Sequence, residues 1–194
     1  MKMENDTAER ILDSAHALIA ERGYAAFSYA DIADVVKIRK ASIHYHFPSK
    51  EALVTAVLKR HRAKLNAGIE MLNAQIPDPF ARLAAYMNHW EGCIRAKTEP
   101  ICIAALLGAE LPTLPEEVKV EIQRHFQDLR DWFRETLEAG VAVRVIRLSL
   151  SAAVEAESLL ALVHGAMISA RAYDSTEVFA LITEGALKRL SPGI

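Results

Sequence analysis

Apolar residues recur every three to four positions along most of this chain, and this spacing constrains its fold more than any other feature. An α-helix turns once in about 3.6 residues, so the spacing places the apolar side chains on one face. An early example is the stripe Ile11, Leu12, Ala15, Leu18 and Ile19. No segment alternates apolar and polar residues with β-branched enrichment, and no Asn-Gly pair marks a hairpin. The sequence therefore predicts an all-α fold of about nine helices and no sheet.

Prolines, glycines and short polar residues predict where the later helices begin and end. Asp78 before Pro79 has the form of an N-cap followed by the first helical residue. Ser151 and Ser175 are expected to cap the last two helices. Gly140 is expected to end the longest helix. The predicted later helices cover residues 79–95, 101–111, 116–139, 152–172 and 176–190.

Residues 27–50, FSYADIADVVKIRKASIHYHFPSK, have the features of two short helices joined by a tight turn. Ser28 and Asp31 have the spacing of a capping box, so a helix of about two turns should begin directly after Ser28. A turn at Lys37 and Ile38 leads into a second helix, predicted over about residues 39–47. Pro48 stops that helix, because the residue before a proline is excluded from helical geometry. Such a helix-turn-helix can place its second helix in the major groove of DNA.

Positive charge and hydrogen-bonding side chains concentrate on this segment. Residues 1–64 hold 11 Lys and Arg against 8 Asp and Glu, whereas the remaining residues hold 12 against 17. Four cations and no acid fall between Val35 and Lys50, interleaved with Ser, His and Tyr that can bind phosphates or base edges. The candidate DNA-contacting residues are Ser28, Lys37, Arg39, Lys40, Ala41, Ser42, His44, Tyr45, His46 and Lys50. His44 and His46 point about 200° apart on a helix, so they cannot chelate one metal ion.

The fourteen residues Ile38–Glu51 resemble the signature of the TetR family of transcriptional regulators, commonly Val-Ser-Lys-Gly-Thr-Leu-Tyr-Tyr-His-Phe-x-x-Lys-Glu. Gly23-Tyr24 and Asp31-Ile32-Ala33 also match the family pattern. The resemblance covers residues 7–60 in detail and only the architecture beyond them. It implies phosphate contacts from Tyr45, His46 and Lys50. It also implies that the residues nearest the bases are Lys40, Ala41, Ser42 and His44.

Three positions depart from the family pattern. Lys37 replaces the usual turn glycine, so a lysine is expected to adopt a positive φ at a cost of roughly 1 kcal/mol, unless the turn differs. Arg39 takes the usual Ser N-cap position, which removes a cap and adds a cation. His44 stands where Tyr is common. These changes leave the fold prediction intact and the operator sequence undetermined.

The resemblance divides the chain into a DNA-binding domain over residues 5–65, with the helix-turn-helix at about 28–47, and an effector-binding and dimerisation domain over residues 66–194. The last two helices are unusually apolar for a surface hairpin, and the resemblance implies a four-helix bundle with a second copy. The alternative is that they fill the core of one protomer. The candidate dimer-interface residues are Leu159, Leu162, Val163, Ala166, Ala170, Phe179, Ile182 and Ala186.

The middle helices are expected to enclose a small-molecule effector. The candidate pocket residues are Tyr86, His89, Trp90, Cys93, Cys102, Leu106, Phe126, Leu129, Trp132 and Phe133. Their apolar and aromatic character favours an uncharged or aromatic molecule, although each residue taken alone fits ordinary core better than ligand contact. The run after Cys102 resembles a branch of electrophile-sensing regulators, similar to N-ethylmaleimide-responsive repressors. This implies a reactive thiol; the alternative is a small buried hydrophobe.

Other functional classes lack support in the sequence. No glycine-rich phosphate loop, metal-ligand cluster or nucleophile elbow is present, so we expect no enzymatic activity, cofactor or metal. The first thirty residues lack the apolar core of a secretory signal, and the apolar stretch 158–170 is too short to span a bilayer. The chain is therefore predicted to be a cytoplasmic, homodimeric repressor that binds double-stranded operator DNA and is released by an effector. A regulator without an effector is the main alternative.

Overall fold

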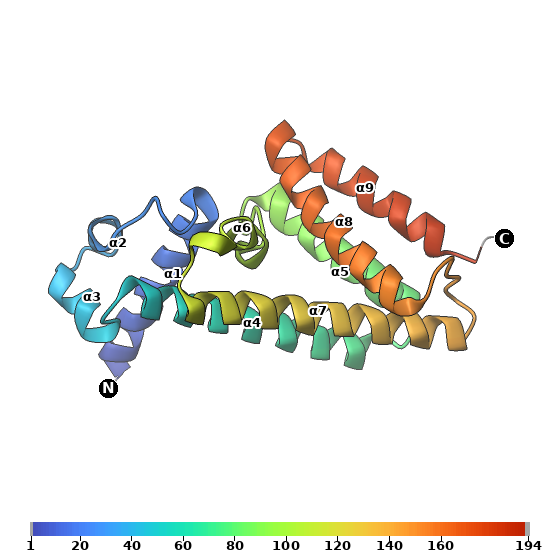
Figure 1. Cartoon of the computed structure of the whole chain (residues 1–194), viewed down its shortest axis with the longest axis horizontal. Coiled ribbons are helices and arrows are strands. Elements are labelled where there is room, and N and C mark those ends of the chain that lie inside the picture. Colours follow the sequence, from blue (N-terminus) through green and yellow to red (C-terminus); the bar gives the residue numbers. More distant parts are fainter. Residues whose placement is uncertain (1, 193–194) are drawn as a thin grey trace. The chain divides into compact units, whose positions relative to one another are not determined.

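The computed structural model describes residues 2–192, with side-chain environments from Asp6 onward. Over this range the chain forms nine α-helices, one short 3-10 helix and no strand, which confirms the predicted all-α class (Figure 1). The helices are α1 (Lys2–Arg22), α2 (Tyr29–Val36), α3 (Lys40–His46), α4 (Lys50–Gln75), α5 (Pro79–Ala96), α6 (Ile103–Ala109), η1 (Leu111–Thr113), α7 (Glu116–Ala142), α8 (Ala152–Tyr173) and α9 (Thr176–Leu190).

The chain divides into two compact units that are not simply its two halves. The N-terminal unit comprises Met1–Lys64 and Ile103–Arg124, and the C-terminal unit comprises Leu65–Cys102 and His125–Ile194. Residues 103–124 lie within the expected effector domain, yet they pack with the first 64 residues. This segment, called the strap below, contains α6, η1 and the first turns of α7.

The core of the N-terminal unit forms where α1 packs against α2, α3 and α6. The five apolar residues of the predicted α1 stripe are all buried. Ile32 of α2 and Ile43 of α3 are completely inaccessible to solvent. The Arg10 guanidinium donates to the carbonyl of Val36 at 2.7 Å, which satisfies an acceptor at the end of α2. Apolar burial and this end contact fix α2 and α3 against α1.

The C-terminal unit is built around α9, which packs against both α8 and α5. Val163 of α8 and Phe179 of α9 are completely buried in this core. Ser151 begins α8 as predicted, because its hydroxyl accepts from the amide of Val154 at 3.4 Å. Ser175 occupies the N-cap position of α9 but makes no cap hydrogen bond, since its hydroxyl donates to Glu177 at 2.6 Å.

The prediction that Gly140 ends the longest helix is wrong, because α7 continues to Ala142. The turn that follows contains Arg144 in left-handed geometry, with φ 63°. The amides of Val145 and Ile146 then donate back to the carbonyl of Gly140 at 2.9 and 3.1 Å. A Cβ on Gly140 would lie 2.4 Å from Cδ1 of Ile146. The glycine therefore allows the chain to fold back closely over the helix and does not terminate it.

Helix α8, at 22 residues, is long and apolar enough to cross a membrane by length and composition alone. This is weak evidence, because the core helix of a folded domain meets the same test. The helix carries Glu155, Glu157 and Arg171. Its buried residues, Leu159, Leu160, Val163, Met167 and four others, form one side of the C-terminal unit. Core packing accounts for the apolar residues on this side of α8.

Candidate functional site

The start of α2 has the capping box that the sequence predicts. The Ser28 hydroxyl accepts from the amide of Ala30 at 3.2 Å, and the amide of Ser28 donates to the Asp31 carboxylate at 2.7 Å. The Ser28 hydroxyl also donates to the same carboxylate, at 2.7 Å. These hydrogen bonds lower the pKa of Asp31. Ser28 therefore has a structural role at the helix end, whether or not it also contacts DNA.

The turn between α2 and α3 places Lys37 in left-handed geometry, with φ 61° and ψ 46°. The positive φ expected for this lysine is confirmed. Its amide donates to the carbonyl of Ala33 at 2.9 Å, and the amide of Ile38 donates to the same carbonyl at 3.2 Å. A lysine in this region carries strain of about 1–2 kcal/mol relative to glycine, because its Cβ approaches its own backbone.

Helix α3 is anchored by its inner side and by its C-terminal end. Ile43 is completely buried. The Tyr29 hydroxyl donates to the carbonyl of Phe47 at 2.9 Å, and burial raises the pKa of Tyr29 to about 12. Arg39 occupies the N-cap position without a side-chain cap bond, as expected. The helix spans two residues fewer than predicted, since Arg39 and Phe47 both have extended backbone geometry.

The predicted DNA contacts of α3 lie mostly on its outer side. Tyr45 is 76% exposed and stacks edge-on against His46. His44 is exposed but rests on the Tyr29 ring, with centroids 4.7 Å apart. Ser42 and His46 are half-buried. The other exposed candidates are Lys37, Arg39, Lys40 and Ala41. Within residues 6–192 none of these three cations pairs with a carboxylate, so their charges are uncompensated by protein.

Lys50 differs from the other predicted phosphate contacts. Its ammonium donates to the carbonyl of Phe27 at 2.5 Å. It also lies over the rings of Tyr24 and Phe27, 4.8 and 4.2 Å from their centroids. Partial burial lowers the pKa of Lys50, opposed by the carboxylates of Asp31 and Glu110. The charge of Lys50 is thus engaged within the protein.

Besides Cys102, five of the ten effector candidates are buried side chains of the C-terminal unit, and they include an aromatic cluster. The Tyr86 ring lies 5.2 Å from Trp132 and 5.4 Å from Phe133. Burial raises the pKa of Tyr86, so its hydroxyl stays protonated at neutral pH. The Trp132 indole donates to Asn73 at 3.1 Å. These five candidates are Tyr86, Trp90, Leu129, Trp132 and Phe133.

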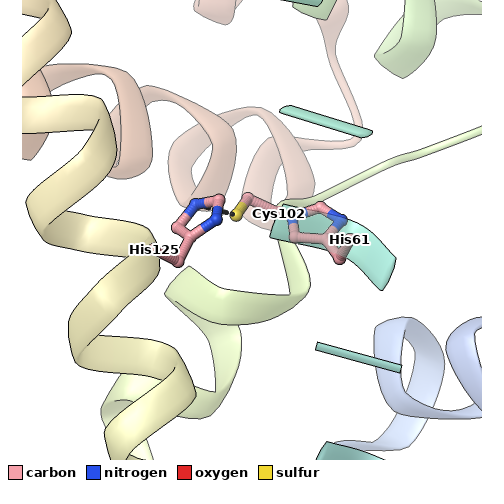
Figure 2. A group of neighbouring side chains, drawn as sticks. All are labelled: His61, Cys102 and His125. Atoms are coloured by element: carbon pink, nitrogen blue, oxygen red, sulfur yellow. Dashed lines mark hydrogen bonds between the residues drawn. The ribbon is translucent and has the colours of Figure 1, made fainter. Parts of the chain in front are cut away.

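The remaining effector candidates have different surroundings. Cys102 is completely buried, and its sulfur lies 3.4 Å from Nε2 of His125 (Figure 2). Cys93 is half-buried, lies 3.7 Å from Nε2 of exposed His89, and has a pKa raised by burial. Phe126 is half-buried in the C-terminal unit. Leu106 belongs to the strap, and therefore to the N-terminal unit.

Two buried histidines near these residues were not among the candidates predicted from the sequence. His125 contacts Cys102, as described above. His164 of α8 lies 4.9 Å from Phe126 between ring centroids and 6.4 Å from His125. Burial lowers the pKa of His164 to about 4, so it is neutral at pH 7. Neither of its ring nitrogens has a hydrogen-bond partner in the described part of the chain. The only sequence signal was a polar residue within the apolar row of α8.

Most of the predicted dimer-interface residues are not on the surface. Six of the eight are buried within the protomer: Leu159, Val163, Ala166, Ala170, Phe179 and Ala186. Only Leu162 and Ile182 are partly exposed. Two larger apolar side chains of the same helices do reach solvent, Ile168 at 51% and Leu181 at 73% exposure. The exposed apolar side chains of α8 and α9 therefore differ from most of the candidates that the helical period singled out.

Comparison with known proteins covers both parts of the chain. Residues 11–57 match the family model described as bacterial regulatory proteins, tetR family, and residues 79–185 match the tetracyclin repressor-like C-terminal domain. A TetR-family transcriptional regulator from Agrobacterium tumefaciens has a solved structure that is 46% identical, with a TM-score of 0.95, covering 97% of this chain and 99% of that one.

Two curated repressors are more distant relatives. NemR from Escherichia coli is 25% identical over 90% of this chain and 88% of its own length. DhaR from a Mycobacterium is 26% identical over 82% of this chain and 80% of its own length. Both are described as HTH-type transcriptional repressors. Together with the helix-turn-helix geometry, the two family matches establish that this chain belongs to the TetR family of bacterial transcriptional regulators.

Proposed function

We propose that this DNA-binding repressor acts as a cytoplasmic homodimer, and that an uncharged or aromatic small molecule releases it from its operator. The observation that carries the proposal is the outer side of α3. There, Lys37, Arg39 and Lys40 present charges without carboxylate partners in the described chain, beside exposed His44 and Tyr45. A helix held rigidly by Ile43 and bearing such groups suits the major groove of DNA.

Within this proposal the residues of α3 and of the turn before it have two roles. Tyr45, His46, Lys37 and Arg39 bind phosphates, which fixes the position of the helix on the duplex. The residues that face the base edges are Lys40, Ala41, Ser42 and His44. Phosphate contacts contribute to affinity for all sequences, whereas base contacts discriminate between sequences.

The operator experiment compares Lys40→Ala and Ser42→Ala with the control Lys59→Ala, which changes an exposed lysine of α4 in the same unit. We expect the first two variants to relax preference at one or two base pairs of each half-site, by about 1–3 kcal/mol per position. The control should retain the base preference. Unchanged specificity in both α3 variants would contradict base contact by this side of the helix.

Dimerisation follows from the need to read two half-sites with one short helix each. The exposed apolar side chains Ile168 and Leu181, with partly exposed Leu162 and Ile182, support a face of α8 and α9 that a second copy covers. Leu181→Glu should shift the protein towards monomer in analytical ultracentrifugation and weaken operator binding. Met71→Glu, at a similarly exposed apolar position of α4, is the matched control. A Leu181→Glu variant that stayed as dimeric as the control would contradict the assignment.

Effector binding in the C-terminal unit is supported by its aromatic residues and by neutral His164, which favour an uncharged ligand. A ligand that binds only the folded protein raises its stability by mass action, by about 2.7 kcal/mol at one hundred times Kd. A thermal-shift screen with uncharged aromatic compounds therefore tests the proposal. Ligands identified in this way should also reduce operator affinity. If none stabilises the fold, a regulator without an effector is favoured.

A second candidate for the signal is covalent modification of Cys102. The observation in its favour is the 3.4 Å contact between the sulfur and Nε2 of His125, which can accept the thiol proton. Complete burial of the thiol opposes fast reaction. N-ethylmaleimide should then release the operator in the parent chain and in Cys93→Ala but not in Cys102→Ala. Release that persists in Cys102→Ala would reject this candidate.

A further inference from the structure

Glu110, directly after α6, reaches the connection between α1 and α2. Both of its carboxylate oxygens accept from the amide of Tyr24, each at 3.2 Å. The connection, Gly23–Ser28, is called the α1–α2 loop below, and it leads directly into the helix-turn-helix. Although Glu110 lies within the residues that match the C-terminal family model, it belongs to the N-terminal unit. The residue that follows α6 in the strap therefore accepts a hydrogen bond from the backbone of the loop before the helix-turn-helix.

Gly23 makes this approach sterically possible. Its φ is +77°, and its amide donates to the carbonyl of Ile19 at 2.9 Å, which ends α1. A Cβ at this position would lie 2.1 Å from Oε1 of Glu110 and 3.1 Å from its Cδ. Glycine is thus required at position 23 for two reasons: the left-handed backbone geometry and the close approach of the Glu110 carboxylate.

Lys50 holds the other end of the same loop. It donates to the carbonyl of Phe27 and lies over the Tyr24 and Phe27 rings, as described above. The loop is therefore fixed at the Tyr24 amide by the strap and at the Phe27 carbonyl by the first residue of α4. Fixing both ends restricts how α2 and α3 are presented to DNA.

The strap is attached to the N-terminal unit at a second place. Glu121 of α7 is 2% exposed and lies 3.7 Å from Arg62 of α4. The chain enters the strap directly after Cys102 and leaves it directly before His125, and these two residues contact each other in the C-terminal unit.

We propose that Glu110 is a positioning residue that sets the α1–α2 loop, and with it α3, for operator binding, and that Lys50 serves this loop instead of a DNA phosphate. The inference rests on the operator binding proposed above. Glu110 acts through the Tyr24 amide and touches no DNA. Its loss should weaken operator binding while leaving the phosphate contacts of α3 in place.

Glu110→Ala and Glu110→Gln in the full-length protein test this role. Loss of a hydrogen bond to a charged acceptor should reduce operator affinity at least about ten-fold in Glu110→Ala. Amide exchange at Tyr24 should become faster in that variant. Glu110→Gln keeps one acceptor oxygen and should recover part of both the affinity and the protection. Wild-type affinity and unchanged Tyr24 exchange in Glu110→Ala would overturn the proposal.

Lys50→Met supplies an independent readout, since it removes the charge but keeps the apolar stem. Operator affinity should fall while the dependence of log affinity on log salt keeps its slope. A slope shallower by about 0.9 would identify a phosphate contact and overturn the assignment of Lys50. Lys40→Ala and Lys59→Ala provide comparison slopes for a helix α3 cation and for an exposed α4 cation.

Failure of the proposed function gives a different result. If the parent chain bound no duplex at any salt concentration, operator binding would be rejected. Tyr24 exchange would still decide the role of Glu110, because protection in the parent and its loss in Glu110→Ala depend only on the hydrogen bond. Equal exchange in parent and variant would reject the positioning role by itself.

Discussion

Because Lys37 has left-handed backbone geometry and an exposed charge, we predict that substitutions there can change folding stability and DNA affinity separately. Lys37→Gly and Lys37→Ala both remove one exposed cation from the turn before α3. Only glycine also removes the steric strain at φ 61°, because alanine retains a Cβ. The two variants therefore form a matched pair that differs in backbone strain and shares the same loss of charge.

Relief of left-handed strain is worth about 1–2 kcal/mol, and the greater freedom of glycine in the unfolded chain offsets about 0.4–1 kcal/mol of it. Lys37→Gly should thus be about 0.5–1 kcal/mol more stable than Lys37→Ala. In a chain of this size that difference raises the melting temperature by about 1–4 °C, measured at equal protein concentration.

Operator titrations over a range of salt concentrations provide the second readout. If Lys37 contacts a phosphate, both variants should lower the salt slope by about 0.9 relative to the parent. Equal stability of the two variants would refute strain at this turn. If both variants kept the salt slope of the parent chain, the phosphate contact would be refuted and the strain argument would stand.

Two further predictions concern the C-terminal unit. The pKa of buried His164, lowered from 6.5 to about 4, means that the unfolded chain binds this proton at higher pH than the folded one. The free energy of unfolding should therefore decrease as pH falls from about 6.5 to about 4, by at most about 3 kcal/mol. Urea titrations of His164→Leu should show a weaker pH dependence over that window, and an unchanged one would assign the effect to other groups. Gly140→Ala should destabilise by about 1–3 kcal/mol, because its Cβ would lie 2.4 Å from Ile146. Gly92→Ala, with no atom within 4 Å of its added Cβ, should instead stabilise α5 by about 0.5–1 kcal/mol, and equal effects of the two would contradict the steric argument.

The helix-turn-helix was predictable because its signals are local. A capping box needs only Ser28 and Asp31, and a proline at position 48 acts on its own neighbour. The strained Lys37 followed from one substitution in a recognisable turn. These features depend on residues a few positions apart, where sequence spacing and spatial distance agree.

The sequence was least informative where a residue serves a distant part of the chain. Gly140 resembles a helix terminator in sequence, but its function is to accommodate Ile146. Val163 and Phe179 match a dimer stripe in period, yet their own protomer buries them. Lys50 matches a phosphate-binding position in the family signature, and only the structure places the Phe27 carbonyl beside it. Periodicity alone does not specify which surface covers an apolar side chain.

The packing of the strap limits how TetR-family regulators with this arrangement can be recombined. A hybrid joined at residue 65 would take its operator-reading half from one parent and residues 103–124 from another. The operator-reading half would then need a glycine at position 23, because a Cβ there would clash with Glu110 of the other parent. It would also need an arginine at position 62 to pair with Glu121 of the other parent. Hybrids that transfer the strap together with the first 64 residues keep these native pairs, and should therefore retain operator binding more often.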